Sequence, residues 1–514
     1  MNGHHNREQD QHKLSRRKVL QLGSKLAILT IGGPILASCG GGGGGGTPTA
    51  GMTSPSPSPA SPSPAAPGVT PEATPAASMA PSASPTPAST AATGATGWQV
   101  RFKEQATITA WGFNTDNTTA RVRVNLFKQT YPNIQLRLVP EITDQKILTA
   151  VASGQVPDLF WIGRNSVISW AARGALEPLN DLIENDDRFN MDNFYESAVK
   201  EVTWDDQIWA IPQFMDVRAL WINHKPLQEV GIKPDDVDPK NWNQLQQYGV
   251  KLTKKQGNRL TRWGFDHKVQ DGYMWMWSWA NNSNLLSEDG RTATFATPEN
   301  VEALRYAAET IQKQGGWKAF DAFRQTWQWD AQHPVIQNQV ALTLYESWLL
   351  GMIAEFAPDH PFNVIPFTDK SGKIVTAVGG LAWAIPKGAK NKEAAWEFIS
   401  FMSDAQVWLR GAKAQANEEK GKYVPSLTAN KEADKLLREQ VYSPINDAID
   451  SAVALFPRLL NNSQAPPPSP VNAEINDILN NDAVLPALRG EKSPEDALKA
   501  AQEKAQAAID KFFK

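Results

Sequence analysis

The order of apolar patterns between residues 105 and 162 constrains the fold of this chain more than any other feature. Residues 105–113, 132–140 and 159–162 alternate or run apolar as strands do, whereas residues 120–127 and 147–151 repeat apolar side chains at helical spacing. A β-α-β-α-β order of this kind predicts parallel strands joined by right-handed crossovers. The sequence therefore predicts an α/β fold with helices covering a mainly parallel sheet.

Two tryptophans lie where such a sheet binds ligands. Parallel sheets take up ligands outside the carboxyl ends of their strands, and Trp111 and Trp161 stand at the ends of the first and third predicted strands. An aromatic ring in that position either packs into the core or lines a binding site. We favour contact with a ligand for Trp161, and both alternatives stay open for Trp111.

The stretch "DGYMWMWSWANNSN", residues 271–284, crowds four aromatic rings beside several polar side chains. Large aromatic side chains usually pack into a core, but rings flanked by Asp and Asn also form platforms for ligands. We expect Trp277 and Trp279 to be core residues. Tyr273 and Trp275 are candidates for either role.

The start of the chain has the order of an export signal. A basic segment with Arg16 and Arg17 is followed by a short apolar run and by "LASC" at residues 36–39. Paired arginines are typical of the pathway that exports folded proteins, and "LASC" resembles the bacterial lipoprotein box, in which lipid is attached to the Cys. We expect residues 1–38 to be a twin-arginine signal of lipoprotein type and Cys39 to be lipidated.

Residues 39–97 consist mostly of Gly, Pro, Ser, Ala and Thr. Without large apolar side chains this stretch cannot offset the entropy lost on ordering, so we expect a disordered stalk. All 19 Trp residues follow it, which places the start of the folded part near Trp98. Cys39 is the only Cys of the chain, and a disulfide framework is therefore excluded.

The folded part shows no pattern of a catalytic or nucleic-acid-binding protein. Removing the six Lys and Arg and the two Asp and Glu of residues 1–38 from totals of 51 and 54 leaves 45 against 52, whereas a nucleic-acid partner requires a basic face. The four His that follow the stalk are not spaced as metal ligands, and the carboxylate pairs at 205–206 and 235–236 lie in turn-like sequences. We expect no catalytic site, no metal and no cofactor.

The residues that remain suit a sugar. Sugars present apolar C–H faces and a rim of hydroxyls, so a site for them needs flat aromatic rings and planar polar side chains. Many Trp residues with well-spaced Asp and Asn match that need.

Five segments, found in order along residues 105–512, carry a family resemblance. They include "GQVPDLFWIG", "IWAIPQFMDVRALWIN" followed by "NWNQL", "LYESW", "AIPKGAKNKEAAWEFI" and "GEKSPEDALKAAQEKA". Together they resemble the motifs of the extracellular solute-binding proteins of family 1, the maltose-binding type, which supply sugar importers of the ATP-binding cassette (ABC) class.

The resemblance implies a two-lobed periplasmic-binding-protein fold of type II, with a hinge between the lobes and the solute in the cleft between them. Closure on the ligand would be a hinge motion. We expect the chain to cross the hinge near residues 211–215, near 363–367 and after 421. The expected lobes are residues 98–213 with 366–421 and residues 214–365 with 422–514.

The resemblance also implies roles for single residues. Trp161 matches the aromatic residue after the "PD" strand, and Trp348 matches the stacking tryptophan of the motif represented here by "YESW". Asp216 matches a cleft carboxylate four residues after the hinge proline, and Tyr273 matches a cleft tyrosine.

The sequence departs from the maltose-binding type at Arg164, where that type has an acidic residue. Maltodextrin itself is therefore in doubt as a ligand, although we keep Arg164 among the candidate ligand-binding residues. Trp275 and Trp383 are further candidates that could equally belong to the core. On the Ala-rich helix that follows, Trp396 is expected to be a core residue.

These features predict a receptor that is not an enzyme. It would be a monomer, anchored through Cys39 to the outer face of the cell membrane, binding a sugar or oligosaccharide and delivering it to the membrane subunits of an ABC importer. A receptor of the same fold for a polyamine or a glycerophosphodiester is the first alternative. The second is a carbohydrate-active enzyme, because glycosidases also combine Trp platforms with carboxylates.

Overall fold

The computed structural model of the protein describes residues 97–140 and 142–514. The predicted export signal, the predicted lipidation site Cys39 and residues 39–96 of the predicted stalk lie outside the described residues. Within the described ranges, no helix is both long enough and apolar enough to cross a membrane.

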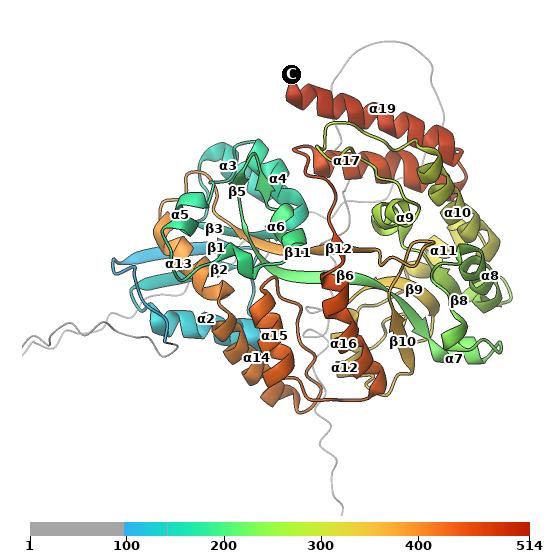
Figure 1. Ribbon diagram of the computed structural model, residues 1–514, viewed down its shortest axis with the longest axis horizontal. Helices are drawn as coiled ribbons and strands as arrows, with labels where there is room; N and C mark the ends of the chain where they lie inside the picture. Colours follow the sequence, from blue (N-terminus) through green and yellow to red (C-terminus); the bar gives the residue numbers. More distant parts are fainter. Residues whose placement is uncertain (1–96, 141) are drawn as a thin grey trace, which may run out of the picture. The chain divides into compact units, whose positions relative to one another are not determined.

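Helices and strands alternate from β1 to β3, both continue to β11, and mostly helices follow β11 (Figure 1). The strands are β1 (Ala106–Trp111), β2 (Ile134–Val139), β3 (Leu159–Gly163), β4 (Thr203–Trp204), β5 (Gln207–Ile208), β6 (Ile211–Asn223), β7 (Lys254–Gln256), β8 (Arg259–Asp266), β9 (Val340–Glu346), β10 (Phe362–Ile365), β11 (Thr376–Ala384) and β12 (Ser463–Gln464). The helices are α2 (Thr118–Thr130), α3 (Asp144–Ser153), α4 (Arg164–Ala172), α5 (Asn180–Glu184), α6 (Glu196–Lys200), α7 (His224–Gln228), α8 (Trp242–Leu252), α9 (Met274–Ala280), α10 (Pro298–Gln314), α11 (Trp317–Arg324), α12 (Leu349–Phe356), α13 (Lys392–Ser403), α14 (Ala405–Glu419), α15 (Lys431–Gln440), α16 (Asp447–Leu460), α17 (Asn472–Ile478), α18 (Leu485–Arg489) and α19 (Pro494–Phe513).

The predicted β-α-β-α-β order is confirmed. β1 pairs in parallel with β2 and with β3, and α2 and α3 are the crossover helices. Local chemistry sets the helix ends: the side chain of Asn117 accepts from the Ala120 N–H before α2, and Gly154 adopts a left-handed conformation after α3, with φ of 66°. The side chain of Ser493 caps the start of the last helix, α19, by accepting from the Asp496 N–H.

β6 connects the two halves of the sheet. The strand order is β2-β1-β3-β11-β6-β9-β8-β7. β6 runs antiparallel to β11 through residues 211–217 and antiparallel to β9 through residues 218–222, while β9 pairs in parallel with β8. One strand therefore serves both halves, and the predicted α/β fold with two lobes is confirmed.

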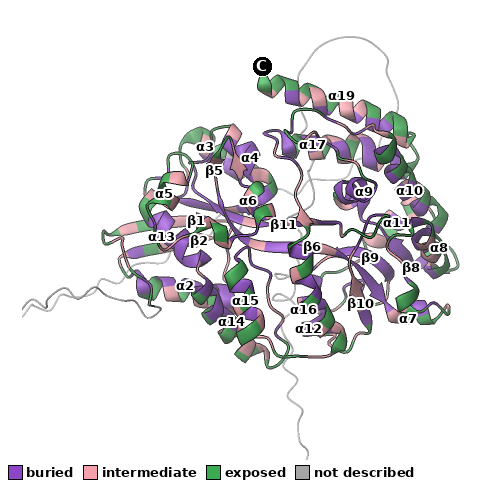
Figure 2. Ribbon diagram, in the orientation of Figure 1, coloured by how far each residue is buried: buried purple, intermediate pink, exposed green. Residues whose placement is uncertain are grey.

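Two large hydrophobic cores support the sheet. The first includes Phe127, Trp383 and Phe398 and extends along β6 and β9 to Trp221 and Tyr345, and the second includes Trp263 and Trp277. β6 and β9 are buried along most of their length (Figure 2). The predicted core residues are confirmed, since all three are buried: Trp277, Trp279 and Trp396.

The exact lobe boundaries stay a prediction. The first predicted crossing lies within β6, and at the second β10 pairs with β6. After residue 421, α15 packs first against α14, where Leu437 and Trp408 share one cluster. Only residues from Val471 onward join the second core.

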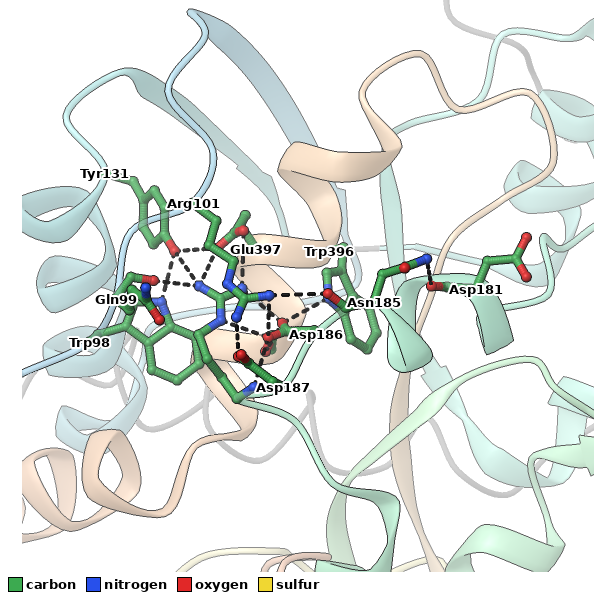
Figure 3. A network of polar contacts seen from close by, with 12 residues as sticks. Trp98, Gln99, Arg101, Tyr131, Asp181, Asn185, Asp186, Asp187, Trp396 and Glu397 are labelled. Atoms are coloured by element: carbon green, nitrogen blue, oxygen red, sulfur yellow. Dashed lines mark hydrogen bonds and ion pairs between the residues drawn. The ribbon is translucent and has the colours of Figure 1, made fainter. Parts of the chain in front are cut away.

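A network of buried charges lies at the first core (Figure 3). The guanidinium group of Arg188 makes two hydrogen bonds of 3.0 Å to the Glu397 carboxylate. It also lies 2.7 and 2.8 Å from the two oxygens of Asp186, through Nε and Nη2. Two buried carboxylates are thus paired with one guanidinium, which offsets much of the cost of removing these charges from water.

The same network fastens the start of the described chain. Trp98 Nε1 donates to the Tyr131 hydroxyl at 2.7 Å, and Tyr131 in turn donates to Glu397. Arg188 Nη1 also donates to the carbonyl oxygen of Gln99 at 2.6 Å. Trp98 and Gln99 are therefore held to the first core by the groups that neutralise its buried charges (Figure 3).

Candidate functional site

Charged side chains gather where β6 passes from one half of the sheet to the other. Asp216 and Arg218 are two residues apart on β6, so their side chains emerge on the same face. They form an ion pair between Arg218 Nη1 and Asp216 Oδ1. The β6–β9 register sets Arg218 opposite Glu346, whose carboxylate lies 3.9 Å from Arg218 Nη2. One guanidinium thus stands between two carboxylates.

Arg164 is buried beneath this group, at the start of α4. Its Nε lies 2.7 Å from Glu201, its Nη2 donates to the carbonyl oxygen of Gly379 at 2.6 Å, and its Nη1 donates to that of Phe214. Each of its three nitrogens therefore has an acceptor within the protein. The sequence made Arg164 a candidate ligand contact, whereas its side chain is wholly buried in this structure.

A pair of glycines on β11 leaves room for both guanidinium groups. A Cβ added to Gly379 would lie 2.7 Å from Arg218 Nη1 and from Asp216 Oδ1, which is closer than real Cβ contacts. Gly380 has φ of 140°, and a Cβ there would overlap Arg164 Nη1 and the Phe214 carbonyl. Glycine is therefore required at position 380, where a Cβ would meet main chain, whereas a side chain at position 379 would displace the ends of the Arg218 and Asp216 side chains.

Tyr273 lies beside the same charges. Arg218 Cζ is 5.7 Å from the centre of its ring. Burial, and next the Glu346 carboxylate, raise the pKa of Tyr273 well above its ordinary value. Burial also raises the pKa of Asp216, against the opposing charge of Arg218. The Tyr273 phenol is therefore neutral, and the Glu346 carboxylate is the nearby acceptor for its hydroxyl.

In the first half of the sheet, Trp161 is half-buried on β3. Its Nε1 donates to Gln213 Oε1 at 2.9 Å, and its ring meets Phe113 edge-on, with centroids 5.2 Å apart. Trp383 lies behind it at 6.2 Å and is fully buried against Phe113 and Phe398. Trp161 therefore keeps some exposed surface, and Trp383 supports it from the core.

In the second half of the sheet, Trp348 follows the end of β9 and is half-buried. Its ring meets that of Tyr345 at 5.3 Å and 68°. Tyr345 is held by its hydroxyl, 3.2 Å from His333 Nε2, and by Lys268 Nζ, 4.6 Å from its ring centre. These contacts set the position of Trp348 next to the end of the strand that carries Glu346.

Two other candidates have partners outside this group. Trp111 packs against Phe160 and lies 4.6 Å from Lys146 Nζ. Trp275 is buried and donates from Nε1 to Asn476 at 2.9 Å. The structure therefore joins Asp216 and Tyr273 through Arg218 and pairs Trp161 with Trp383, while Arg164 is bonded to Glu201 and to main chain.

Sequence reasoning missed the charged partners Arg218, Glu201 and Glu346. Two of them carry a local signal, because Arg218 follows Asp216 by two residues on one strand and Glu346 precedes Trp348 by two. Glu201 carries none, since its pairing with Arg164 depends on the fold.

Two further features of the described residues are the lack of a metal-ligand cluster and a surface hollow away from the charged group. In the described part of the chain, no three His, Cys, Asp or Glu side chains form a group able to hold a metal ion. A surface hollow of about 320 Å³ lies elsewhere, between α10 and the start of α19, and includes Arg305, Gln312 and Lys492 in its lining.

The protonation state of His333 gives a test of its burial beside Tyr345 and Trp348. Burial, and next the charge of Lys268, lower the pKa of His333 to about 3. The Val335 N–H donates to Nδ1 at 3.3 Å, which also favours the neutral ring. Between pH 6.5, the ordinary His pKa, and about pH 3, the unfolded chain binds a proton at His333 and the folded protein does not. The stabilising contribution is therefore complete above pH 6.5 and is lost as the pH falls toward 3.

We expect His333→Gln to reduce the pH dependence of stability by about 1 kcal/mol per pH unit below pH 6.5. Urea unfolding of the variant and the wild type at pH 7, 6, 5 and 4.5 measures this slope. Equal slopes for the two proteins would contradict a neutral, buried His333.

Both the sequence and the fold are similar to those of known binding proteins. The sequence model of a family described as bacterial extracellular solute-binding protein matches residues 110–407. A binding protein of Brucella abortus is 26% identical over 392 residues, which cover 75% of this chain and 88% of that protein. An arabinooligosaccharide-binding protein of Bacillus subtilis is 22% identical over 318 residues, covering 58% and 69%. An ABC transporter solute-binding protein of Thermotoga lettingae, solved with α-D-tagatose, has a TM-score of 0.62 at 24% identity, covering 79% of this chain and 100% of that one.

Proposed function

Because this chain belongs to the bacterial extracellular solute-binding proteins, we propose that it is a receptor that binds a sugar or oligosaccharide between its two lobes and delivers it to an ABC importer. The proposal includes export by the twin-arginine signal and attachment to the membrane through lipid on Cys39. The protein itself would perform no chemistry on the solute.

One arrangement supports a sugar above all. Half-buried rings, Trp161 and Trp348, belong to the two halves of the sheet, and the group Asp216, Arg218 and Glu346 lies on the strand that joins them and on its neighbour. Flat rings suit the C–H faces of a sugar, while carboxylate and guanidinium groups suit its hydroxyls. Tyr273 adds a neutral hydroxyl beside Glu346.

The charges of this arrangement favour a neutral solute. Arg218 pairs with Asp216, and Arg164 pairs with Glu201. A polyamine would need carboxylates without internal partners, and a phosphodiester would need guanidinium groups without them. Both alternatives are therefore less well supported than a sugar.

We expect Trp348→Ala to weaken sugar binding by about tenfold or more, because a stacking ring and its buried apolar area are lost together. Asp216→Asn should weaken it as well, because the amide keeps the shape but loses the charged acceptor. The measurement is a thermal-shift screen of the full-length protein against mono- and oligosaccharides, polyamines and glycerophosphodiesters. A ligand at a hundred times its Kd should stabilise the wild type by about 2.7 kcal/mol.

The matched control is Trp317→Ala, which removes another half-buried tryptophan, at the start of α11 and packed against the second core. It should lower the midpoint of unfolding without changing the shift caused by ligand. A shift with polyamines or phosphodiesters alone would refute the sugar proposal. Cleavage of a bound glycan, followed by chromatography of the products, would instead favour the enzyme.

A further inference from the structure

Trp329 is an exposed aromatic residue that the motifs of the sequence do not single out. It is 39% exposed, in the loop between α11 and β9. The other large exposed apolar side chains of the described residues, Val250, Phe356 and Phe513, stand on or beside other helices. A single exposed tryptophan needs no explanation by itself, so the case depends on what surrounds it.

The neighbours of Trp329 are the residues that hold Trp348. Its ring centre is 6.4 Å from that of Trp348, at an angle of 51° between the planes. His333 lies 5.6 Å from the Trp329 ring and 6.4 Å from the Trp348 ring. Tyr345 also touches both rings, at 6.4 and 5.3 Å. Trp329 and Trp348, which come from different segments, thus both pack against His333 and Tyr345.

The loop that carries Trp329 has a fixed turn next to it. Asp330 accepts from the Gln332 N–H through its side chain and from the His333 N–H through its carbonyl, each at 2.8 Å. His333 is fully buried. Trp329 is therefore followed directly by an anchored segment. A ligand that stacks on the Trp329 ring would lose little free energy to ordering of the loop.

We infer that Trp329 gives the proposed sugar site a second stacking ring beside Trp348, so that the site takes chains of more than one sugar unit; this inference rests on the proposed function. The tilt between the rings keeps them from stacking on each other. It leaves each ring able to meet the C–H face of a different unit of the same chain. Of these two rings, a monosaccharide would use Trp348 and not Trp329.

The experiment is a binding series by sugar length. Isothermal titration of the full-length protein would use arabinose, arabinobiose and arabinotriose, and glucose, maltose and maltotriose. We expect Trp329→Ala to weaken di- or trisaccharide binding by about threefold to tenfold and to change monosaccharide binding by less than about twofold. Trp348→Ala should weaken every length that binds.

Two further variants separate stacking from a general effect. Trp329→Phe keeps an aromatic face and should recover most of the lost affinity, whereas Phe356→Ala removes an exposed ring from α12 and should change nothing. If the wild type binds the longer sugars and Trp329→Ala binds them equally well, the role of Trp329 is overturned and the receptor stands. If the wild type binds no sugar of either series, the proposed function is contradicted, and the inference that rests on it is contradicted as well.

Discussion

Replacing Arg164 with methionine is expected to lower the free energy of unfolding by about 3 to 5 kcal/mol, because it leaves Glu201 buried without its partner. The side chain of Arg164 is wholly buried and that of Glu201 is 8% exposed. Burial already raises the pKa of Glu201, and Arg164 is the main group that opposes this shift. The carbonyl oxygens of Phe214 and Gly379 lose a donor at the same time.

Urea unfolding followed by circular dichroism measures this loss, and a double-mutant cycle assigns it. The double variant Arg164→Met, Glu201→Leu should lose less free energy of unfolding than the sum of the two single variants, because neither buried charge is then left without its partner. Arg164→Lys should be intermediate, because an ammonium keeps the charge but cannot reach three acceptors. If Arg164→Met keeps the wild-type urea midpoint and loses ligand binding, Arg164 is the ligand contact that the sequence predicted.

Gly264→Ala is expected to cost about 3 kcal/mol or more, at the upper end of what overpacking costs, because the added methyl group meets main chain. Gly264 lies on β8, directly under α8. A Cβ there would overlap the carbonyl oxygen of Gly249 and lie 2.6 Å from its carbonyl carbon. Since no side chain can move aside, the helix must shift away from the strand and its packing on Phe265 must open.

The matched control is Gly351→Ala, within α12. A Cβ at that position meets nothing within 4 Å, so the change should stabilise the protein by up to about 1 kcal/mol through helix propensity. Thermal and urea unfolding of both variants provide the comparison. Equal midpoints for the two alanine variants would mean that α8 and β8 are not in the close contact described.

The elements were the most predictable part of the fold. The alternation around Trp111 and the helical spacing around Phe127 depend only on neighbours along the chain, and both elements formed where expected. The start of α19 after Ser493 depends on the same kind of local signal, because an N-cap acts within one turn. The burial of Trp277 and Trp396 followed from composition and spacing alone.

The candidate site was predictable only in part. Motif resemblance selected Asp216, Trp161 and Trp348, and their role in binding stays a prediction. The same resemblance could not show that Arg164 would be enclosed by Glu201 and two carbonyl groups. Nor could it show that Trp329, nineteen residues before Trp348, would stand 6.4 Å from it.

The sequence by itself determined which segments are helices and strands, where several of them begin and end, and which family the chain resembles, because these depend on periodicity and on short motifs. Only the tertiary structure decided which charges meet. Arg218 faces Glu346 because β6 and β9 pair in one register, and a shift of one residue would send these side chains to opposite faces of the sheet. Partners 37 and 128 residues apart, as for Arg164 with Glu201 and Arg218 with Glu346, meet only once the chain has closed around both cores.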